Sequence, residues 1–289
     1  MSEDRQGTDA ATVRGLVASA YGRLVSERQG GGEDRPACSS CSPRAEAIGY
    51  SAEDLSAVPA GTEVPTFGCG NPLAFSEVQE GQTVVDLGSG AGLDLLIAAE
   101  QVGPSGRVIG VDMTEEMVAT SRRNIAAAGR TNVEVRQGLI EELPVESGTA
   151  DWVISNCVIN LSPEKGRVFA EIARALRPGG RMLVSDIVVE DLPRWVRESA
   201  AALSACVGGA VSEESYVAGL GEAGLADVEV RQRHVYDSAT LRALIASPEV
   251  AGEGCCSGEG CGDAGRLSDE LGGKVASIKV FARKPSTGA

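Results

Sequence analysis

The feature that most constrains this chain is residues 83–94, Thr-Val-Val-Asp-Leu-Gly-Ser-Gly-Ala-Gly-Leu-Asp. An apolar run at 84–87 ends in a glycine-rich turn at 88–92, and a helix-like segment begins at Leu93. This pattern predicts a buried strand, a tight loop and a helix in succession. A ligand can approach such a loop closely because glycine has no Cβ, and the following helix offers free N–H groups. The stretch therefore indicates a site for a nucleotide-like ligand.

Glycine spacing and two acids narrow the choice of that ligand. A dinucleotide loop of the form G-x-G-x-x-G would need its third glycine at Leu93, and the lysine of a P-loop is missing. Asp86 lies at the end of the expected strand, where a carboxylate suits an amine-bearing or cationic ligand better than a pyrophosphate. Asp112 ends the next strand, and an acid at that place can bind both hydroxyls of a ribose.

Apolar runs and helix-like segments alternate from residue 83 onward. Near-continuous apolar strands separated by helices are typical of a parallel sheet that is covered on both faces. We therefore expect an α/β fold, a doubly wound, mostly parallel, seven-stranded sheet of Rossmann-like type. The expected strands are 83–87, 107–112, 133–137, 151–155, 181–188, 227–234 and 275–283, and the expected helices are 9–26, 72–79, 93–101, 114–128, 163–176, 192–203, 212–223 and 238–246.

Three parts are expected along the chain. Residues 1–60 form an N-terminal helical and loop extension, 61–190 form the ligand-binding Rossmann-like core, and 191–289 form a smaller α+β part that completes the sheet. Within the last part, residues 247–273 hold eight glycines and several acids, which predicts a flexible Gly/Cys-rich insertion.

Composition excludes several classes of function. The formal charge is 26 − 41 = −15, which opposes binding to nucleic acid or to an anionic membrane. No run approaches the roughly 20 apolar residues of a membrane span, and the polar N-terminus has no signal-peptide core. We therefore expect a cytoplasmic protein, a monomer, whose partners are small molecules.

Eight cysteines and a single histidine, His234, set the metal and thiol chemistry. Irregular spacing in a reducing compartment favours free, reactive or ligand-binding thiols over a disulfide scaffold. A zinc site built on imidazoles or a Ser-His-Asp triad is poorly supported with one histidine. Cys157 follows the fourth expected strand, so it should lie at the ligand-binding edge of the sheet.

The order of these motifs resembles that of the class I, Rossmann-like S-adenosylmethionine-dependent methyltransferases. Residues 86–92 fit the loop D-x-G-x-G-x-G of that class, and the turn 177–180 before strand five fits as well. The resemblance implies S-adenosylmethionine as cofactor. After strand three, where many relatives have an acid, backbone groups of Leu139 and Ile140 or the side chain of Glu141 would serve. The implied cofactor contacts are Asp86, Gly88, Ser89, Gly90, Asp112, Met113, Leu139, Ile140, Asn156 and Val158.

Three cysteine motifs make the resemblance more specific. Gly-Cys-Gly-Asn-Pro around Cys69, Ser-Asn-Cys-Val-Ile-Asn-Leu around Cys157 and Ala-Cys-Val-Gly-Gly-Ala around Cys206 are similar to those of the arsenite methyltransferases. The resemblance implies that these three thiols bind trivalent arsenic as catalytic ligands, and that Cys38 or Cys41, upstream, takes part in redox cycling. It also implies arsenite and methylarsenite as substrates, a role in arsenic detoxification, and a thiol reductant, glutathione or thioredoxin.

Two other functions stay open from the sequence. One is a small-molecule C- or O-methyltransferase in which the cysteines are incidental, because free cysteine often serves as a small buried hydrophobe. The other is a non-catalytic protein that binds a metalloid without turnover. Thiolates are soft ligands that suit trivalent arsenic, so they would be needed both in an arsenite methyltransferase and in a metalloid-binding protein.

Overall fold

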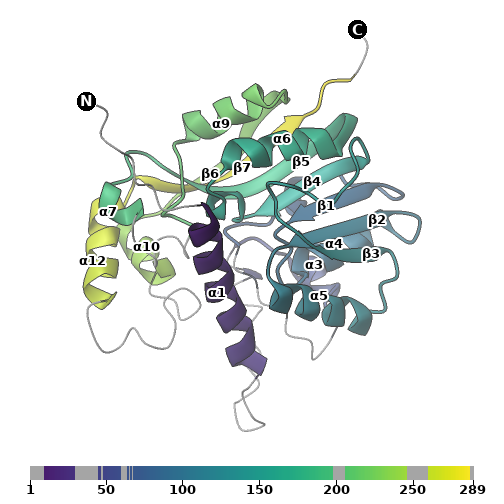
Figure 1. The fold of residues 1–289 in the computed structure, drawn as a ribbon, viewed down its shortest axis with the longest axis horizontal. Helices are drawn as coiled ribbons and strands as arrows, with labels where there is room; N and C mark the ends of the chain where they lie inside the picture. The colour runs from purple at the N-terminus through teal and green to yellow at the C-terminus, as the bar shows by residue number, and fades with distance from the viewer. Residues whose placement is uncertain are drawn as a thin grey trace.

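The computed structural model is built around a single central sheet (Figure 1). It describes residues 10–29, 45–46, 48–59, 64, 66, 68–197, 206–245 and 260–286. Cys38, Cys41, Cys255 and Cys256 lie outside the described residues, so the redox role expected of Cys38 or Cys41 stays a prediction.

The sheet has seven strands in the order β3-β2-β1-β4-β5-β7-β6, which confirms the predicted doubly wound fold. Only β7 runs antiparallel to its neighbours, β5 and β6. The strands are β1 (Thr83–Leu87), β2 (Arg107–Asp112), β3 (Val133–Gln137), β4 (Ala150–Asn156), β5 (Leu176–Val189), β6 (Ala226–Val235) and β7 (Val275–Arg283).

Helices cover both faces of the sheet (Figure 1). α4 (Leu93–Val102) and α5 (Glu115–Ala127) lie on one face, and α6 (Lys165–Ala175) and α9 (Glu213–Glu222) lie on the other. Each face has its own apolar core: Leu95 and Leu96 of α4 are fully buried in one, and Ile172 of α6 is fully buried in the other. Two-sided burial explains why the central strands are continuous apolar runs.

The N-terminal part supplies one long helix and a short capped one. α1 (Ala10–Gln29) packs against α5 and lies beside the ends of the central strands (Figure 1). α3 (Ala52–Ser56) begins with a capping box in which the Ser51 side chain accepts the N–H of Asp54 and the Asp54 carboxylate accepts the N–H of Ser51. The expected helix at 72–79 is only the 3₁₀ turn η1 (Leu73–Phe75), because the chain is extended from Ser76.

Two expectations for the second half need correction. β5 already begins at Leu176, so the 177–180 turn is an irregularity inside the strand rather than a turn before it. Gly179 there has φ +76°, a conformation that favours glycine. The expected helix at 192–203 is described only as α7 (Arg194–Arg197), since 198–205 lie outside the described residues.

The predicted flexible insertion 247–273 is wrong for its second half, where α12 (Gly260–Leu271) is a regular helix. Composition suggested flexibility, but Leu267 and Leu271 are buried and the Arg266 guanidinium lies 4.4 Å from the Trp195 ring centre. α12 packs against α10 (Ser238–Ile245), and with α7 they form a small helical group at one end of the molecule (Figure 1). None of the described helices is long and apolar enough to cross a membrane.

Candidate functional site

The glycine-rich loop after β1 is held by backbone bonds from the neighbouring strand. The N–H groups of Gly88 and Ser89 both donate to the carbonyl of Val111, at 2.7 and 3.1 Å. Gly88, Gly90 and Gly92 all have positive φ. A Cβ on Gly88 would stand 2.4 Å from the Val158 side chain, whereas a Cβ on Gly90 would meet nothing within 4 Å. The loop is therefore packed against the protein at Gly88 and open at Gly90.

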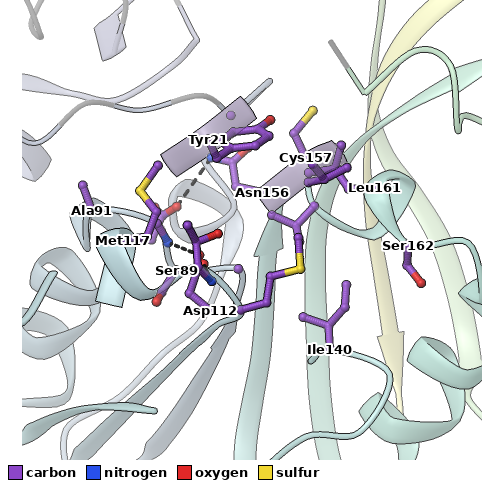
Figure 2. Close-up of a pocket in the computed structure, with 18 of the residues that line it drawn as sticks. Tyr21, Ser89, Ala91, Asp112, Met117, Ile140, Asn156, Cys157, Leu161 and Ser162 are labelled. Atoms are coloured by element: carbon purple, nitrogen blue, oxygen red, sulfur yellow. Dashed lines mark hydrogen bonds between the residues drawn. The ribbon is translucent and has the colours of Figure 1, made fainter. Parts of the chain in front are cut away.

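That open side faces a cavity at the carboxyl ends of β1, β2 and β4 (Figure 2). The cavity encloses about 940 Å³ of empty space including its mouth, a size typical of cofactor sites. Its position agrees with the rule that open α/β sheets bind ligands outside the carboxyl ends of their strands. Its lining includes the predicted cofactor contacts Gly88, Ser89, Gly90, Asp112, Met113, Ile140, Asn156 and Val158, and also Cys157, which was predicted as an arsenic ligand.

Asp112 is fixed at the floor of this cavity. Its two carboxylate oxygens accept the N–H groups of Gly90 and Thr114, each at 2.9 Å. Burial raises the pKa of Asp112, and the backbone donors oppose that rise. The carboxylate keeps further lone pairs for a ligand, because each oxygen can accept more than one hydrogen bond.

Two predicted contacts are placed differently. Asp86 is buried beneath the cavity rather than in its lining, and burial raises its pKa well above the usual range, with Asp94 and Asp112 adding to the rise. Leu139 pairs with Glu142 in an isolated bridge, and Gly138, Ile140 and Glu141 line the cavity at this turn. The Ser89 hydroxyl is buried, and none of the described residues is its hydrogen-bond partner. An unpaired polar atom beside open glycine backbone fits a ligand with polar groups such as the adenosyl-methionine of the expected cofactor.

The structure brings Cys69, Cys157 and Cys206 into one cluster of side chains. The backbone N–H of Cys157, just after β4, donates to the carbonyl of Ser185 at 2.8 Å. The Cys206 thiol donates to the carbonyl of Cys157 at 2.8 Å, and the Cys69 sulfur lies 3.7 Å from the Ser185 hydroxyl. Contacts with β5 and with the end of β4 thus bring thiols from three distant segments together at the carboxyl edge of the sheet, where the cavity lies.

Strain and burial mark the two deeper thiols. Cys157 has φ +62° and Cys206 has φ +61°, a region that non-glycine residues rarely occupy. Burial raises the pKa of Cys157 well above its usual range, and the neighbouring thiols of Cys206 and Cys69 add to the rise. Residues held in such conformations tend to lie at functional sites, because the surrounding structure has to maintain them.

The three thiols lie in one cluster, but they are not arranged as a metal-binding site. Among the described residues, no group of three or more His, Cys, Asp or Glu side chains is arranged to hold a metal ion. One reason is visible in the hydrogen bond of the Cys206 thiol to the Cys157 carbonyl, which turns that sulfur toward the backbone. A Cys206 thiolate that bound arsenic would have no proton to donate, so this hydrogen bond would be lost on binding.

Sequence reasoning missed several side chains around the cavity. Tyr50 donates to Asp94 at 2.8 Å, and Asp94 lines the cavity from the first turn of α4. Arg14 of α1 pairs with Glu141 at 3.1 Å and with Glu164. Only the spacing of α1 could have suggested its face toward the site, and no motif marks Tyr50.

Tyr21 of α1 lines the cavity beside Asn156 and Cys157 (Figure 2). Burial raises the pKa of its hydroxyl well above the usual value, and the Cys206 and Cys157 thiols contribute to the rise. α1 therefore covers both the cofactor cavity and the thiol cluster.

The sheet order and a cavity on a glycine-rich loop define a methyltransferase of the Rossmann-like class. A family model described as a methyltransferase domain matches residues 78–237, more than half of the chain. The chain belongs to the arsenite methyltransferase family within that class.

This assignment rests on similarity to known arsenite methyltransferases. The crystal structure of an arsenic(III) S-adenosylmethionine methyltransferase from Chlamydomonas reinhardtii is similar with a TM-score of 0.64 and 31% identity, over 82% of this chain and 73% of that one. Arsenite methyltransferases of Halobacterium salinarum and Homo sapiens are 48% and 35% identical, over 64% and 50% of this chain and 47% and 41% of their own lengths. The chain thus spans about half the length of the curated relatives it matches.

Proposed function

We propose that this protein transfers methyl groups from S-adenosylmethionine to trivalent arsenic held by Cys69, Cys157 and Cys206, with arsenite and then methylarsenite as substrates. One observation carries the proposal: three thiols from distant segments share one cluster at the carboxyl edge of the sheet, and Cys157 also lines the cofactor cavity. Thiolates are the ligands that soft ions prefer.

We assign one set of residues to binding the cofactor and the three thiols to binding the arsenic acceptor. Ser89, Gly90, Asp112 and Met113 would hold the adenosyl part of the cofactor, and Asn156 and Val158 would flank its reactive end. S-adenosylmethionine, when bound, supplies an electrophilic methyl group. The thiols replace the three hydroxyls of arsenous acid, so that three As–S bonds form and three waters leave with the thiol protons. Arsenic keeps its lone pair in this pyramidal arrangement, and no general base is needed.

The role of the protein would then be to hold two reactants in a productive orientation. The buried Cys157 thiol has a raised pKa, so proton transfer to the departing hydroxyl accompanies its binding. Methylation formally oxidises arsenic from the trivalent to the pentavalent state. We propose that two thiolates return arsenic to the trivalent state by giving up two electrons and joining in a disulfide, which glutathione or thioredoxin then reduces by thiol–disulfide exchange. Cys38 or Cys41 would take part in that exchange in a monomeric, cytoplasmic enzyme.

The test is a methylation assay. Purified protein, arsenite, S-adenosylmethionine and a thiol are incubated, and the arsenic species are separated by chromatography and identified by mass spectrometry. We expect methylated arsenic from the wild type, at least 100-fold less from Cys157→Ser because oxygen is a poor ligand for a soft ion, and a mild loss from the Cys255→Ser/Cys256→Ser control. Wild-type protein that binds arsenite without forming a methylated product would be a binding protein. Activity on another acceptor that survives serine at Cys69 and Cys206 would identify a C- or O-methyltransferase.

A further inference from the structure

A chain of hydrogen bonds joins the cofactor cavity to the loop that carries Cys69. Its hub is the side chain of Asn156, the last residue of β4. The amide oxygen of Asn156 accepts the N–H groups of Cys69 and Gly70, at 3.0 and 3.3 Å. Its amide nitrogen donates to the Gly70 carbonyl at 2.6 Å. One side chain therefore holds the backbone on both sides of the Cys69–Gly70 peptide.

The same amide nitrogen faces the cavity side. It donates to the Tyr50 hydroxyl at 2.9 Å and lies 3.5 Å from a carboxylate oxygen of Asp94. The Tyr50 hydroxyl in turn donates to the other oxygen of Asp94 at 2.8 Å. Asp94 and Asn156 both line the cavity. The network thus runs from Asp94, on the helix that follows the glycine loop, through Tyr50 and Asn156 to Cys69.

Close packing leaves little slack between this network and the loop. A Cβ on Gly68 would stand 2.2 Å from the Asn156 amide nitrogen, and a Cβ on Gly70 would stand 2.1 Å from the Ser185 hydroxyl. Ser185 also lies 3.7 Å from the Cys69 sulfur. A shift of the Asn156 amide is therefore transmitted directly to the position of Cys69, because tightly packed elements do not deform gradually.

Tyr50 is anchored independently of the cavity. It follows the turn at 48–49 and precedes the Ser51 cap of α3. Asn71, just after the loop, donates to Gly49 and to Asp54 at 3.3 and 3.0 Å. The segment 49–54 consequently contacts both the Asn156 amide, through Tyr50, and the chain that follows the Cys69 loop, through Asn71. Burial raises the pKa of Asp94 to about 6, and the Tyr50 and Asn156 donors oppose the rise.

We propose that Tyr50 and Asp94 are positioning residues that couple cofactor binding to the placement of Cys69, so that an occupied cofactor cavity prepares the thiol site for its substrate. The inference rests on the proposed function for the identity of that substrate. Coupling between two sites is reciprocal: a cofactor that tightens arsenite binding must itself be bound more tightly in the presence of arsenite, by the same factor.

The experiment is a binding cycle without turnover. The dissociation constant of arsenite is measured by calorimetry with and without saturating S-adenosylhomocysteine, in the full-length protein kept reduced. We expect the wild type to bind arsenite at least about 5-fold more tightly with S-adenosylhomocysteine present, the lower range of typical allosteric coupling. Tyr50→Phe removes only the hydroxyl and should reduce this ratio to below about 2, as should Asp94→Asn, which removes the charge.

Ser51→Ala is the matched control. It removes the cap of α3 next to Tyr50, which costs about 1 kcal/mol of stability, but it leaves the Asp94–Tyr50–Asn156 contacts intact. Its ratio should equal that of the wild type even if its melting temperature falls as far as that of Tyr50→Phe. A wild-type ratio near 1, or a wild-type ratio retained by Tyr50→Phe and Asp94→Asn, would overturn the coupling.

A second readout separates this inference from the proposed function. The rate at which N-ethylmaleimide alkylates Cys69 is followed by peptide mass spectrometry with and without S-adenosylhomocysteine. We expect S-adenosylhomocysteine to change this rate several-fold in the wild type and in Ser51→Ala, and much less in Tyr50→Phe. Failure of the wild type to bind arsenite would refute the proposed substrate alone, whereas equal alkylation responses in wild type and Tyr50→Phe would refute the coupling alone.

Discussion

At the scale of single residues, Gly88 and Gly90 lie two positions apart in one loop, but replacing each by alanine should have different consequences. Gly88 has φ +67° and no room for a methyl group, because Val158 would lie 2.4 Å away. Gly88→Ala therefore combines backbone strain with overpacking, and we expect it to lower the free energy of unfolding by about 2–5 kcal/mol. Gly90 has φ +51° but open space, so Gly90→Ala should cost only about 1–2 kcal/mol.

The added methyl of Gly90→Ala would instead stand in the cofactor cavity. We expect its affinity for S-adenosylmethionine to fall at least 10-fold, measured by calorimetry, while denaturant unfolding reports the stability of both variants. Comparable losses of stability in the two variants, with unchanged cofactor affinity in Gly90→Ala, would contradict this division between a packed and an open side of the loop.

Residues of this kind also mark how far the sequence could be interpreted. The placement of Asp112 and of Cys157 followed from topology, because the end of each parallel strand is fixed once the strands are known. Tyr50 and Asp94 are 44 residues apart, and their hydrogen bond depends on how a loop folds back over the sheet. No periodicity or composition encodes such a long-range contact, and the same limit hid Arg14.

At the scale of elements, α1 is held over the cavity by the ion pairs of Arg14 with Glu141 and Glu164. The Glu141 carboxylate is 4% exposed. Without Arg14, its hydrogen-bond donor among the described side chains would be the Ser162 hydroxyl, at 2.8 Å. A buried carboxylate that loses its charged donor costs about 1–3 kcal/mol. We expect Arg14→Met to raise the KM for S-adenosylmethionine about 3- to 10-fold and to accelerate hydrogen exchange in 10–22.

The control is Arg107→Met, which removes the exposed pair with Glu134 at the start of β2. Exposed pairs contribute about 0–1 kcal/mol, so this variant should leave the KM unchanged. An unchanged hydrogen exchange rate of α1 in Arg14→Met would show that apolar contacts such as that of the buried Val17 hold the helix, and that the ion pairs contribute little.

Elements also show where composition misleads. The glycine-rich segment before β7 suggested flexibility throughout, yet α12 forms because two leucines and the stacked Arg266 find partners in the neighbouring helices. In the same way Pro178-Gly179-Gly180 suggested a turn, but backbone hydrogen bonds of Gly179 and Gly180 to Lys284, just after β7, carry β5 through these residues, and β4 pairs on either side of them at Leu176 and Arg181. Tertiary contacts can override local preference, and a single sequence does not reveal those contacts.

At the scale of the whole molecule, a buried acid couples stability to pH. Asp186 on β5 is fully buried, and burial raises its pKa to about 7; the N–H of Ile187, the Lys165 ammonium and the Tyr216 hydroxyl oppose that rise. Asp186 also accepts the Asn160 amide at 2.8 Å. The folded protein therefore retains a proton on this group over a range in which the unfolded chain, with an aspartate pKa of about 3.9, has released it.

Because the folded state binds more protons than the unfolded state between about pH 4 and 7, the contribution of Asp186 to stability falls as pH rises through that range. Each pKa unit of difference corresponds to about 1.4 kcal/mol. Asp186→Asn keeps the size of the side chain and removes the titration. We expect urea unfolding at pH 5, 6, 7 and 8 to show that the wild type loses stability relative to Asp186→Asn by at least about 1 kcal/mol from the lowest to the highest pH. Parallel stability curves for the two proteins would mean that Lys165 and the three donors keep Asp186 charged throughout, and that this acid is a fixed buried anion.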